Sequence, residues 1–374
     1  MRLPLTLSLY IGRYFLFAII ASLAVLLLIS GLVDLLEMIR RASEAPRAVP
    51  FAVVIEMTLL RMPTSAEKIY PFAFLIGGML ALSRLTRNNE LAVTRAAGVS
   101  VWQFLMPGVI LSFALGMFFI GIMSPIAAAT ISRFERVEGK YITGRASILA
   151  ISPTGLWLRQ VGEPNLAYRG RPADEYILHA LRMDPASLQL SEVIIYLFDK
   201  NHQFIGRIDA PDATLQSGRW LIPNATLSDP GELPIQQANY IMPTQLTLLQ
   251  IEDSFAAPET FSFWQLPGFI ALLEKSGFSA LRHKLHFHSL MAMPALLAGM
   301  LLLAAVFSLR QARRGRTGIL MVTGVAIGFI FYFITNLIYA LGSAGHLPVM
   351  LAAWAPSLVV VMFSVAALLH FEDG

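Results

Sequence analysis

Hydrophobic residues gather in long uninterrupted runs near both ends of the chain and do not alternate with polar residues there. A helix that crosses about 30 Å of hydrocarbon needs about 20 apolar residues. Five runs of about that length can be read directly, at residues 14–36, 101–123, 287–309, 319–341 and 349–369. The pattern predicts five helices that each span a membrane.

A sixth apolar run, at residues 69–82, is too short to cross a bilayer by itself. It follows another apolar stretch at residues 51–60, and Pro63 and Glu67 lie between the two. This arrangement indicates either one long helix kinked by proline or an interfacial helix that leads into a span. Six crossings are therefore expected.

The composition agrees with a polytopic membrane protein. Hydrophobic residues make up 56% of the 374 residues and charged residues only 14%, whereas about a quarter of a soluble domain is charged. A wholly water-soluble enzyme is excluded. The chain has no cysteine, which excludes disulfides, thiolate metal sites and cysteine nucleophiles. The net charge of +4 comes from arginines beside the apolar runs and does not indicate a nucleic-acid partner.

Arginine placement predicts the orientation, because loops on the cytoplasmic side are enriched in Lys and Arg. One side of the predicted bundle holds most of these arginines: Arg2, Arg13, Arg84, Arg87, Arg95, Arg310, Arg313, Arg314 and Arg316. That side is expected to be cytoplasmic, with both termini on it. The loop after the first helix carries Arg40, Arg41 and Arg47 on the opposite side, against the rule.

Residues 133–264 have the composition of a soluble domain, with short apolar or alternating segments between turn signals. This pattern is typical of β-strands. The sequence therefore divides into three spans at 1–132, an all-β domain on the outer side at 133–264, and three more spans at 265–374.

The loop between the second and third spans, residues 84–98, predicts a short helix on the cytoplasmic face. Asn88 or Asn89 can cap it, Glu90 falls in its first turn, and Gly98 can end it. The segment is either a simple connector or a coupling helix that docks in a soluble ATPase. In the second case the carboxylate pairs with a partner arginine.

Arg40 and Arg41 follow Glu37 at spacings that allow ion pairs within one helix. A solvated ion-pair face is one interpretation. The alternative is recognition of an anionic headgroup, since clustered arginines bind phosphate bidentately.

The segment Arg87-Asn88-Asn89-Glu90-Leu91…Arg95-Ala96-Ala97-Gly98 resembles the coupling loop of the lipopolysaccharide-export permeases, the LptF/LptG family of ABC transporter membrane subunits. The resemblance covers essentially the whole chain. The start of the chain and the stretch from Ser30-Gly31 to Arg40-Arg41 look more like LptG than LptF. Other matching pieces are Tyr10-Ile11-Gly12-Arg13, Gly218-Arg219-Trp220, Leu347-Pro348 and Ala352-Ala353-Trp354-Ala355-Pro356.

The resemblance implies a permease subunit of an ATP-driven exporter in the bacterial inner membrane, with a periplasmic jelly-roll-like β domain. Such a subunit extracts lipopolysaccharide and passes it to a periplasmic bridge protein that has a β-jelly-roll. It works with a paired LptF-type permease and a cytoplasmic ATPase dimer. The implied ATPase-coupling residues are Glu90, Leu91, Arg95 and Gly98, and the implied lipopolysaccharide-binding residues are Arg40, Arg41, Arg133 and Arg136.

Neither catalysis nor a cofactor is expected in this chain. It contains no Gly-x-x-x-x-Gly-Lys-[Ser/Thr] motif, so ATP and magnesium belong to the partner ATPase. His283, His286 and His288 have no Asp or Glu among them, and no metal site is predicted there.

Two other functions stay open. An ion-coupled lipid flippase needs acids in the membrane, for which Asp34 and Glu67 are the candidates. A mechanotransmitting ABC permease that moves no lipid is the other, although such proteins usually carry the outer domain after the first helix. Copurification with an ATPase separates the flippase from the exporter.

Overall fold

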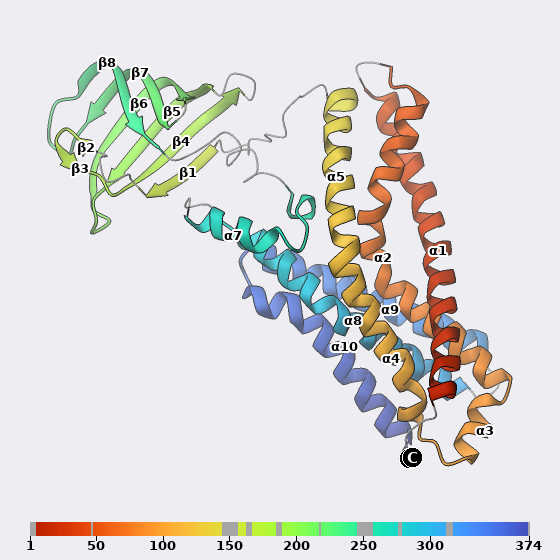
Figure 1. The fold of residues 1–374 in the computed structure, drawn as a ribbon. Coiled ribbons are helices and arrows are strands. Elements are labelled where there is room, and N and C mark those ends of the chain that lie inside the picture. The colour runs from red at the N-terminus through yellow and green to blue at the C-terminus, as the bar shows by residue number, and fades with distance from the viewer. Residues whose placement is uncertain are drawn as a thin grey trace. The chain divides into compact units, whose positions relative to one another are not determined.

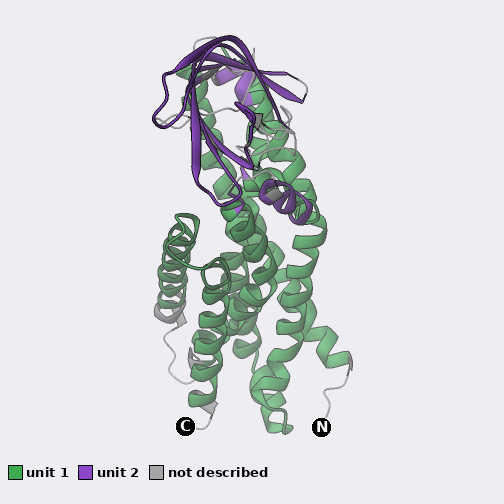
Figure 2. Cartoon of the chain, turned by 90° about the vertical axis from the view of Figure 1, so that its left-hand side faces the viewer, with its two compact units in different colours: residues 1–137, 258–266, 281–374 green, residues 138–257, 267–280 purple. Residues whose placement is uncertain are grey.

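The computed structural model describes residues 5–45, 48–143, 156–161, 167–184, 189–216, 218–244, 257–275, 279–311 and 317–372. The chain divides into two compact units, each described by itself below (Figure 2). Unit 1 is helical and comprises Met1–Val137, Pro258–Leu266 and Leu281–Gly374, whereas unit 2 comprises Glu138–Ala257 and Pro267–Ala280.

Within the described residues, six helices are long and apolar enough to cross a membrane, which confirms the predicted six spans. The third span is built from two α-helices joined by a π-helical turn, η1. The helices are α1 (Leu5–Ser43), α2 (Phe51–Arg87), α4 (Val101–Phe118) with η1 (Phe119–Met123) and α5 (Ser124–Glu138), α8 (Leu281–Gln311), α9 (Thr317–Ser343) and α10 (Val349–Glu372) (Figure 1).

The two apolar stretches before residue 83 form one helix, α2, which contains both Pro63 and Pro71. Glycines allow close helix packing in unit 1, because they have no side chain. A Cβ atom on Gly77 of α2 would lie 2.6 Å from the Cα atom of Ile19 on α1, and one on Gly116 of α4 would lie 2.6 Å from the Cα atom of Pro294 on α8. These two glycines let the first three spans and α8 share one core.

The third span continues past the point where the sequence becomes polar. Helix α5 runs to Glu138, followed by a second π-helical turn, η2 (Gly139–Thr143). The sequence placed the boundary of the β domain at residue 133, where charged residues begin, but charged residues do not by themselves end a helix. The short helix η3 (Pro258–Thr260) and the residues up to Leu266 belong to unit 1.

Unit 2 contains the β domain expected between the third and fourth spans. Six antiparallel strands form one sheet in the order β1-β4-β5-β6-β7-β8, and β2 pairs with β3 in a second, two-stranded sheet. The strands are β1 (Leu156–Val161), β2 (Ala167–Tyr168), β3 (Arg171–Pro172), β4 (Glu175–Asp184), β5 (Gln189–Phe198), β6 (Phe204–Gln216), β7 (Arg219–Ser228) and β8 (Ile235–Pro243). Unit 2 also contains most of helix α7 (Leu266–Lys275).

One face of the large sheet carries the core of unit 2. Val193, Ile195 and Leu197 of β5 are buried, while Ile194 and Tyr196 between them are only half-buried. This alternation follows from the two-residue period of a strand. The apolar run in β5 therefore has one closed face and one partly open face.

Candidate functional site

The first candidate site is a group of charged side chains at the ends of α1, α2 and α5. On α1, Glu37 pairs with two arginines about one turn further along the helix. Its carboxylate accepts from Arg40 Nη2 at 2.8 Å and from Arg41 Nε at 2.8 Å, and Arg40 Nη1 also reaches Glu44 at 3.1 Å. The intrahelical pairs predicted from the spacing are therefore formed.

Arg133 of α5 is brought to α2 by the packing of the bundle. Its Nη2 atom lies 2.5 Å from Oε1 of Glu56, which is 77 positions earlier in the chain. Arg136, one turn after Arg133, donates instead to Ser132 on its own helix at 3.1 Å. The two arginines that the sequence grouped together thus have different partners. Glu56 was not found by sequence reasoning, because no local spacing connects residues so far apart.

A further charged pair joins α1 to α2. Arg61 Nη1 lies 3.7 Å from Asp34 Oδ1, and the Ser65 hydroxyl donates to Asp34 Oδ2 at 3.0 Å. Asp34, one of the two acids that an ion-coupled flippase would use, is thus engaged by a cation and a hydroxyl.

The arginines of this site can bind another anion in place of their carboxylate partners. The side chains of Arg40 and Arg133 are 59% and 62% exposed. A single exposed ion pair such as Arg133 with Glu56 contributes only about 0 to 1 kcal/mol, whereas Arg40 with Glu37 is bidentate and more stable. A phosphate has more negative charge and more acceptor oxygens than a carboxylate. It can therefore replace Glu56 at Arg133 at small cost, and it can compete with Glu37 for Arg40.

The second candidate site is α3 (Glu90–Ala96), at the other end of α2. Leu91 is 6% exposed and belongs to the core of unit 1, so it anchors the helix. Glu90 is half-buried, and Arg95 and Gly98 are exposed.

The exposed side of α3 also carries Val93, which is 68% exposed. Sequence reasoning did not select this residue, although it lies two positions from Leu91 and therefore on nearly the opposite side of a helix. An apolar exposed residue one turn from Glu90 suits a protein partner.

The ends of α3 are set by backbone geometry and not by a side-chain cap. Asn89 occupies the N-cap position with a φ of 60° and makes no capping hydrogen bond through its side chain. Asn88 donates its side-chain amide to Glu90 at 3.2 Å. Gly98 has a φ of 83°, a conformation that favours glycine after a helix.

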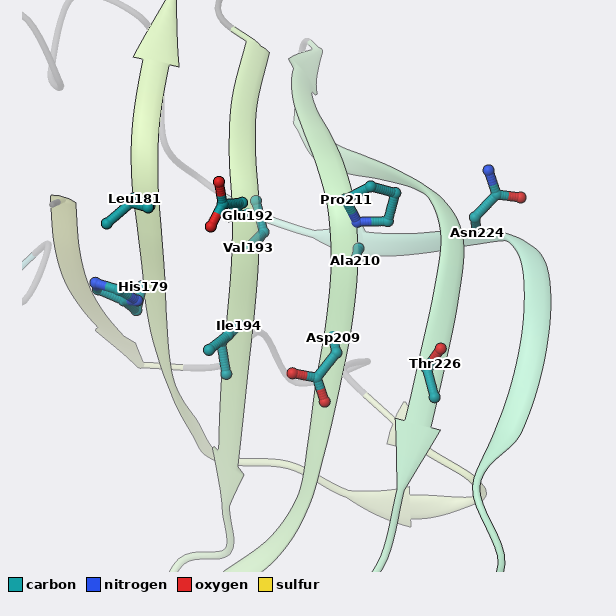
Figure 3. Close-up of a pocket in the computed structure, with 10 residues that line it drawn as sticks. All are labelled: His179, Leu181, Glu192, Val193, Ile194, Asp209, Ala210, Pro211, Asn224 and Thr226. Carbon is teal, nitrogen blue, oxygen red and sulfur yellow. The ribbon is translucent and has the colours of Figure 1, made fainter.

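A shallow pocket lies on the large sheet of unit 2 (Figure 3). Its volume is about 390 Å³, and its lining includes His179, Ile194, Asp209 and Thr226. Glu192, also in the lining, has a φ of 55°. The polar and charged groups among these residues make the pocket unlike a continuous apolar groove for acyl chains.

Comparison with known proteins gives one family over nearly the whole chain. The family model described as lipopolysaccharide export system permease LptF/LptG matches residues 9–370. The lipopolysaccharide export system permease protein LptG of Haemophilus influenzae is 26% identical over 369 residues, which cover 96% of each chain. LptG of Escherichia coli strain K12 is 25% identical over 375 residues, which cover 96% of this chain and 97% of that protein.

Proposed function

Because the chain belongs to the LptF/LptG family of lipopolysaccharide export system permeases, we propose that it extracts lipopolysaccharide from the outer leaflet of the bacterial inner membrane. The observation that carries the proposal is the family match across both the helical unit and the β domain. The β domain and the outer ends of the spans face the periplasm, and both termini face the cytoplasm. The relatives described above are LptG proteins, so the paired permease in the same complex is LptF-type.

The arginines at the outer ends of α1 and α5 select the phosphorylated headgroup. In the resting protein Glu37 and Glu44 neutralise Arg40 and Arg41, and Glu56 neutralises Arg133. When lipopolysaccharide enters, its phosphates replace the carboxylates at Arg40, Arg41 and Arg133, with Arg136 one turn beyond. Loss of weak exposed ion pairs is offset by bidentate phosphate pairs.

Energy for extraction comes from a cytoplasmic ATPase dimer that docks on α3. Leu91 fixes α3 to the bundle, Val93 and the half-buried Glu90 lie on the side of α3 away from Leu91, and Arg95 and Gly98 are exposed near its end. Because α2 spans 37 residues, it is about 55 Å long at 1.5 Å per residue. It connects α3 directly with Glu56 near the opposite end, and can carry movement of the ATPase to the headgroup site.

After extraction, the lipid passes to a periplasmic bridge protein that has a β-jelly-roll. The antiparallel sheet of unit 2, with its closed apolar face, supports a role for the β domain in this transfer.

The proposal is tested by copurification from a Gram-negative host that expresses the chain together with an LptF-type permease and the ATPase. Wild type should retain both the ATPase and lipopolysaccharide. The double variant Arg40→Glu, Arg41→Glu should lose most bound lipopolysaccharide and keep the ATPase, because α3 is untouched. Arg40→Lys, Arg41→Lys is the matched control, which keeps charge but loses the bidentate fork, and should fall between the two.

Failure of wild type to retain the ATPase would contradict the exporter function and favour an ion-coupled flippase. Retention of the ATPase with no bound lipopolysaccharide would favour a mechanotransmitting permease. Equal lipopolysaccharide in wild type and the glutamate variant would show that the α1 arginines form only a solvated ion-pair face.

A further inference from the structure

A cavity of about 720 Å³ lies between α1 and α2, at the end of the bundle where α3 begins. Its inner part is apolar, with Phe17, Ala18 and Ala21 on α1 facing Leu80 and Ala81 on α2. The small side chains of the three alanines leave the space open. Tyr14, Ser83, Arg84, Arg87 and Asn88 form the polar part of the lining.

The two arginines in this lining differ from those at the opposite end of α2. Arg40, Arg41, Arg61 and Arg133 each lie within 4 Å of a carboxylate. Across the described ranges of the chain, none of the ion pairs within that distance involves Arg84 or Arg87. Among the described residues, neither of these two exposed cations has a carboxylate within 4 Å, and the carboxylate of Glu90 accepts instead from Asn88.

Arg84 is oriented by an aromatic ring and not by an acid. Its guanidinium carbon lies 4.9 Å from the centre of the Tyr14 ring, and the Tyr10 hydroxyl donates to the Tyr14 hydroxyl at 3.2 Å. Stacking of this kind uses the face of the guanidinium and leaves the N–H groups in its plane available. The side chain is thus prepared to donate to an anion.

Charge and apolar surface are separated along the cavity as they are in a phospholipid. From Leu80 to Arg87 is seven residues, or about 10 Å along a helix at 1.5 Å per residue. Over that distance the lining changes from apolar side chains at Leu80 to the cation of Arg87. A soluble anion needs only the cations, whereas a phospholipid uses both parts of the lining.

We propose that this cavity binds an anionic phospholipid of the cytoplasmic leaflet, with its phosphate at Arg84 and Arg87 and the upper part of an acyl chain against Ala18, Ala21 and Leu80. The assignment to that leaflet rests on the orientation given with the proposed function. Binding there holds the end of α1 against α2 directly beside α3. The site is separate from the arginines proposed for lipopolysaccharide, which lie at the other end of α2.

The test measures retained lipid by native mass spectrometry of the intact complex, with phosphatidylglycerol and phosphatidylcholine offered in equal amounts. Wild type should retain phosphatidylglycerol in preference to phosphatidylcholine. Arg84→Gln, Arg87→Gln should lower retained phosphatidylglycerol at least about tenfold, as expected for the loss of two charge-assisted pairs. Ala21→Phe should also lower it by filling the apolar part while both arginines remain.

The matched control removes two arginines at the other end of the same bundle. Arg40→Gln, Arg41→Gln should leave retained phosphatidylglycerol unchanged, and Arg84→Gln, Arg87→Gln should leave copurified lipopolysaccharide unchanged. If wild type binds no lipopolysaccharide but still selects phosphatidylglycerol, the proposed function fails and the phospholipid site stands.

Three outcomes would overturn the phospholipid site. The first is equal phosphatidylglycerol in wild type and Arg84→Gln, Arg87→Gln. The second is displacement of the lipid by an equal concentration of glycerol phosphate, which would make the ligand a free anion. The third is retention by the isolated chain that disappears in the complex, which would make the cavity a contact for a partner subunit.

Discussion

Trp264 donates its indole N–H to the backbone carbonyl of Gly121, with 3.1 Å between the two heavy atoms. Gly121 lies in η1, the π-helical turn in the middle of the third span. Next to Trp264, the backbone N–H of Phe263 donates to the Ser124 hydroxyl at 3.0 Å. A π-helical turn interrupts the regular hydrogen bonds of a helix. The segment just before α7 therefore supplies one donor to a backbone carbonyl of this turn and another to the hydroxyl that follows it.

We expect Trp264→Phe to loosen the π-helical turn, because phenylalanine keeps an aromatic ring but has no donor. Loss of one hydrogen bond should lower the unfolding free energy by about 1 kcal/mol. Amide hydrogen exchange across residues 119–128 should rise. Trp102→Phe is the control, since Trp102 precedes the turn by 17 residues and thus by about 25 Å of helix. Equal exchange in both variants would mean that the indole does not stabilise the turn.

Leu91 and Val93 should respond oppositely to substitution, because only Leu91 is buried. Leu91→Ala removes a core contact and should destabilise α3 by about 2 kcal/mol or more, which is measured as faster amide exchange at residues 90–97. Val93→Asp should leave that exchange unchanged and weaken copurification of the ATPase. If Val93→Asp retains the ATPase at the wild-type level, the exposed side of α3 is not the docking face.

Glu56→Gln should not reduce lipopolysaccharide binding, even though it breaks the ion pair with Arg133. If phosphate must replace this carboxylate, its removal makes Arg133 available at no cost, and bound lipopolysaccharide should stay equal or rise up to about fivefold. Arg133→Gln should lower it. Measurement of lipopolysaccharide per complex compares the two variants. A decrease with Glu56→Gln would show that the intact pair is itself the binding element.

The six spans could be predicted because the length of an apolar run is a local property of the sequence. The pair formed by Arg133 and Glu56 could not be predicted, because the two residues are 77 positions apart and meet only through the packing of α2 and α5. The same limit applies to α3. Leu91 and Val93 are both apolar, and only contact with the bundle decides which of them is buried.

The start of α3 gives a second example. Asparagine before Glu90 correctly marked the beginning of the helix, but the pattern indicated a side-chain cap. The structure places Asn89 at the N-cap in the left-handed region, with no cap from its side chain. Asparagine is tolerated in both roles. Its presence therefore indicates where a helix begins, but it does not show whether the side chain or the backbone conformation starts the helix.

Gly206→Ala should destabilise the β domain through a clash with Tyr168. A Cβ atom on Gly206 would lie 2.2 Å from Cε1 of the Tyr168 ring, and both residues are buried. Overpacking of this kind costs about 1 to 3 kcal/mol. The double variant Gly206→Ala, Tyr168→Leu should recover part of the loss, because a smaller side chain leaves room for the methyl group. Limited proteolysis of unit 2 during thermal unfolding measures both effects.

Stability of the β domain should fall at alkaline pH because of Tyr168. Burial first, and the nearby negative charge of Asp229 next, raise the pKa of the Tyr168 hydroxyl above its ordinary value of 10. The hydroxyl donates to the carbonyl of Ser228 at 3.1 Å, which the ionised form cannot do. A pKa raised on folding means that the stabilisation is fully present below pH 10 and is lost as the pH rises toward the higher folded value. Burial also raises the pKa of Tyr240, which adds to the same trend.

The measurement follows thermal unfolding of unit 2 by proteolysis between pH 8 and pH 11. Tyr168→Phe should be less stable than wild type at pH 8, since it lacks the hydrogen bond to Ser228, yet should lose less stability as the pH rises. Tyr168→Phe, Tyr240→Phe should flatten the dependence further. Tyr196→Phe, at a half-buried tyrosine of β5, controls for the general effect of alkaline pH and should follow wild type. If Tyr168→Phe loses stability as steeply as Tyr196→Phe, ionisation of Tyr168 does not limit the domain, and its ring contributes by packing alone.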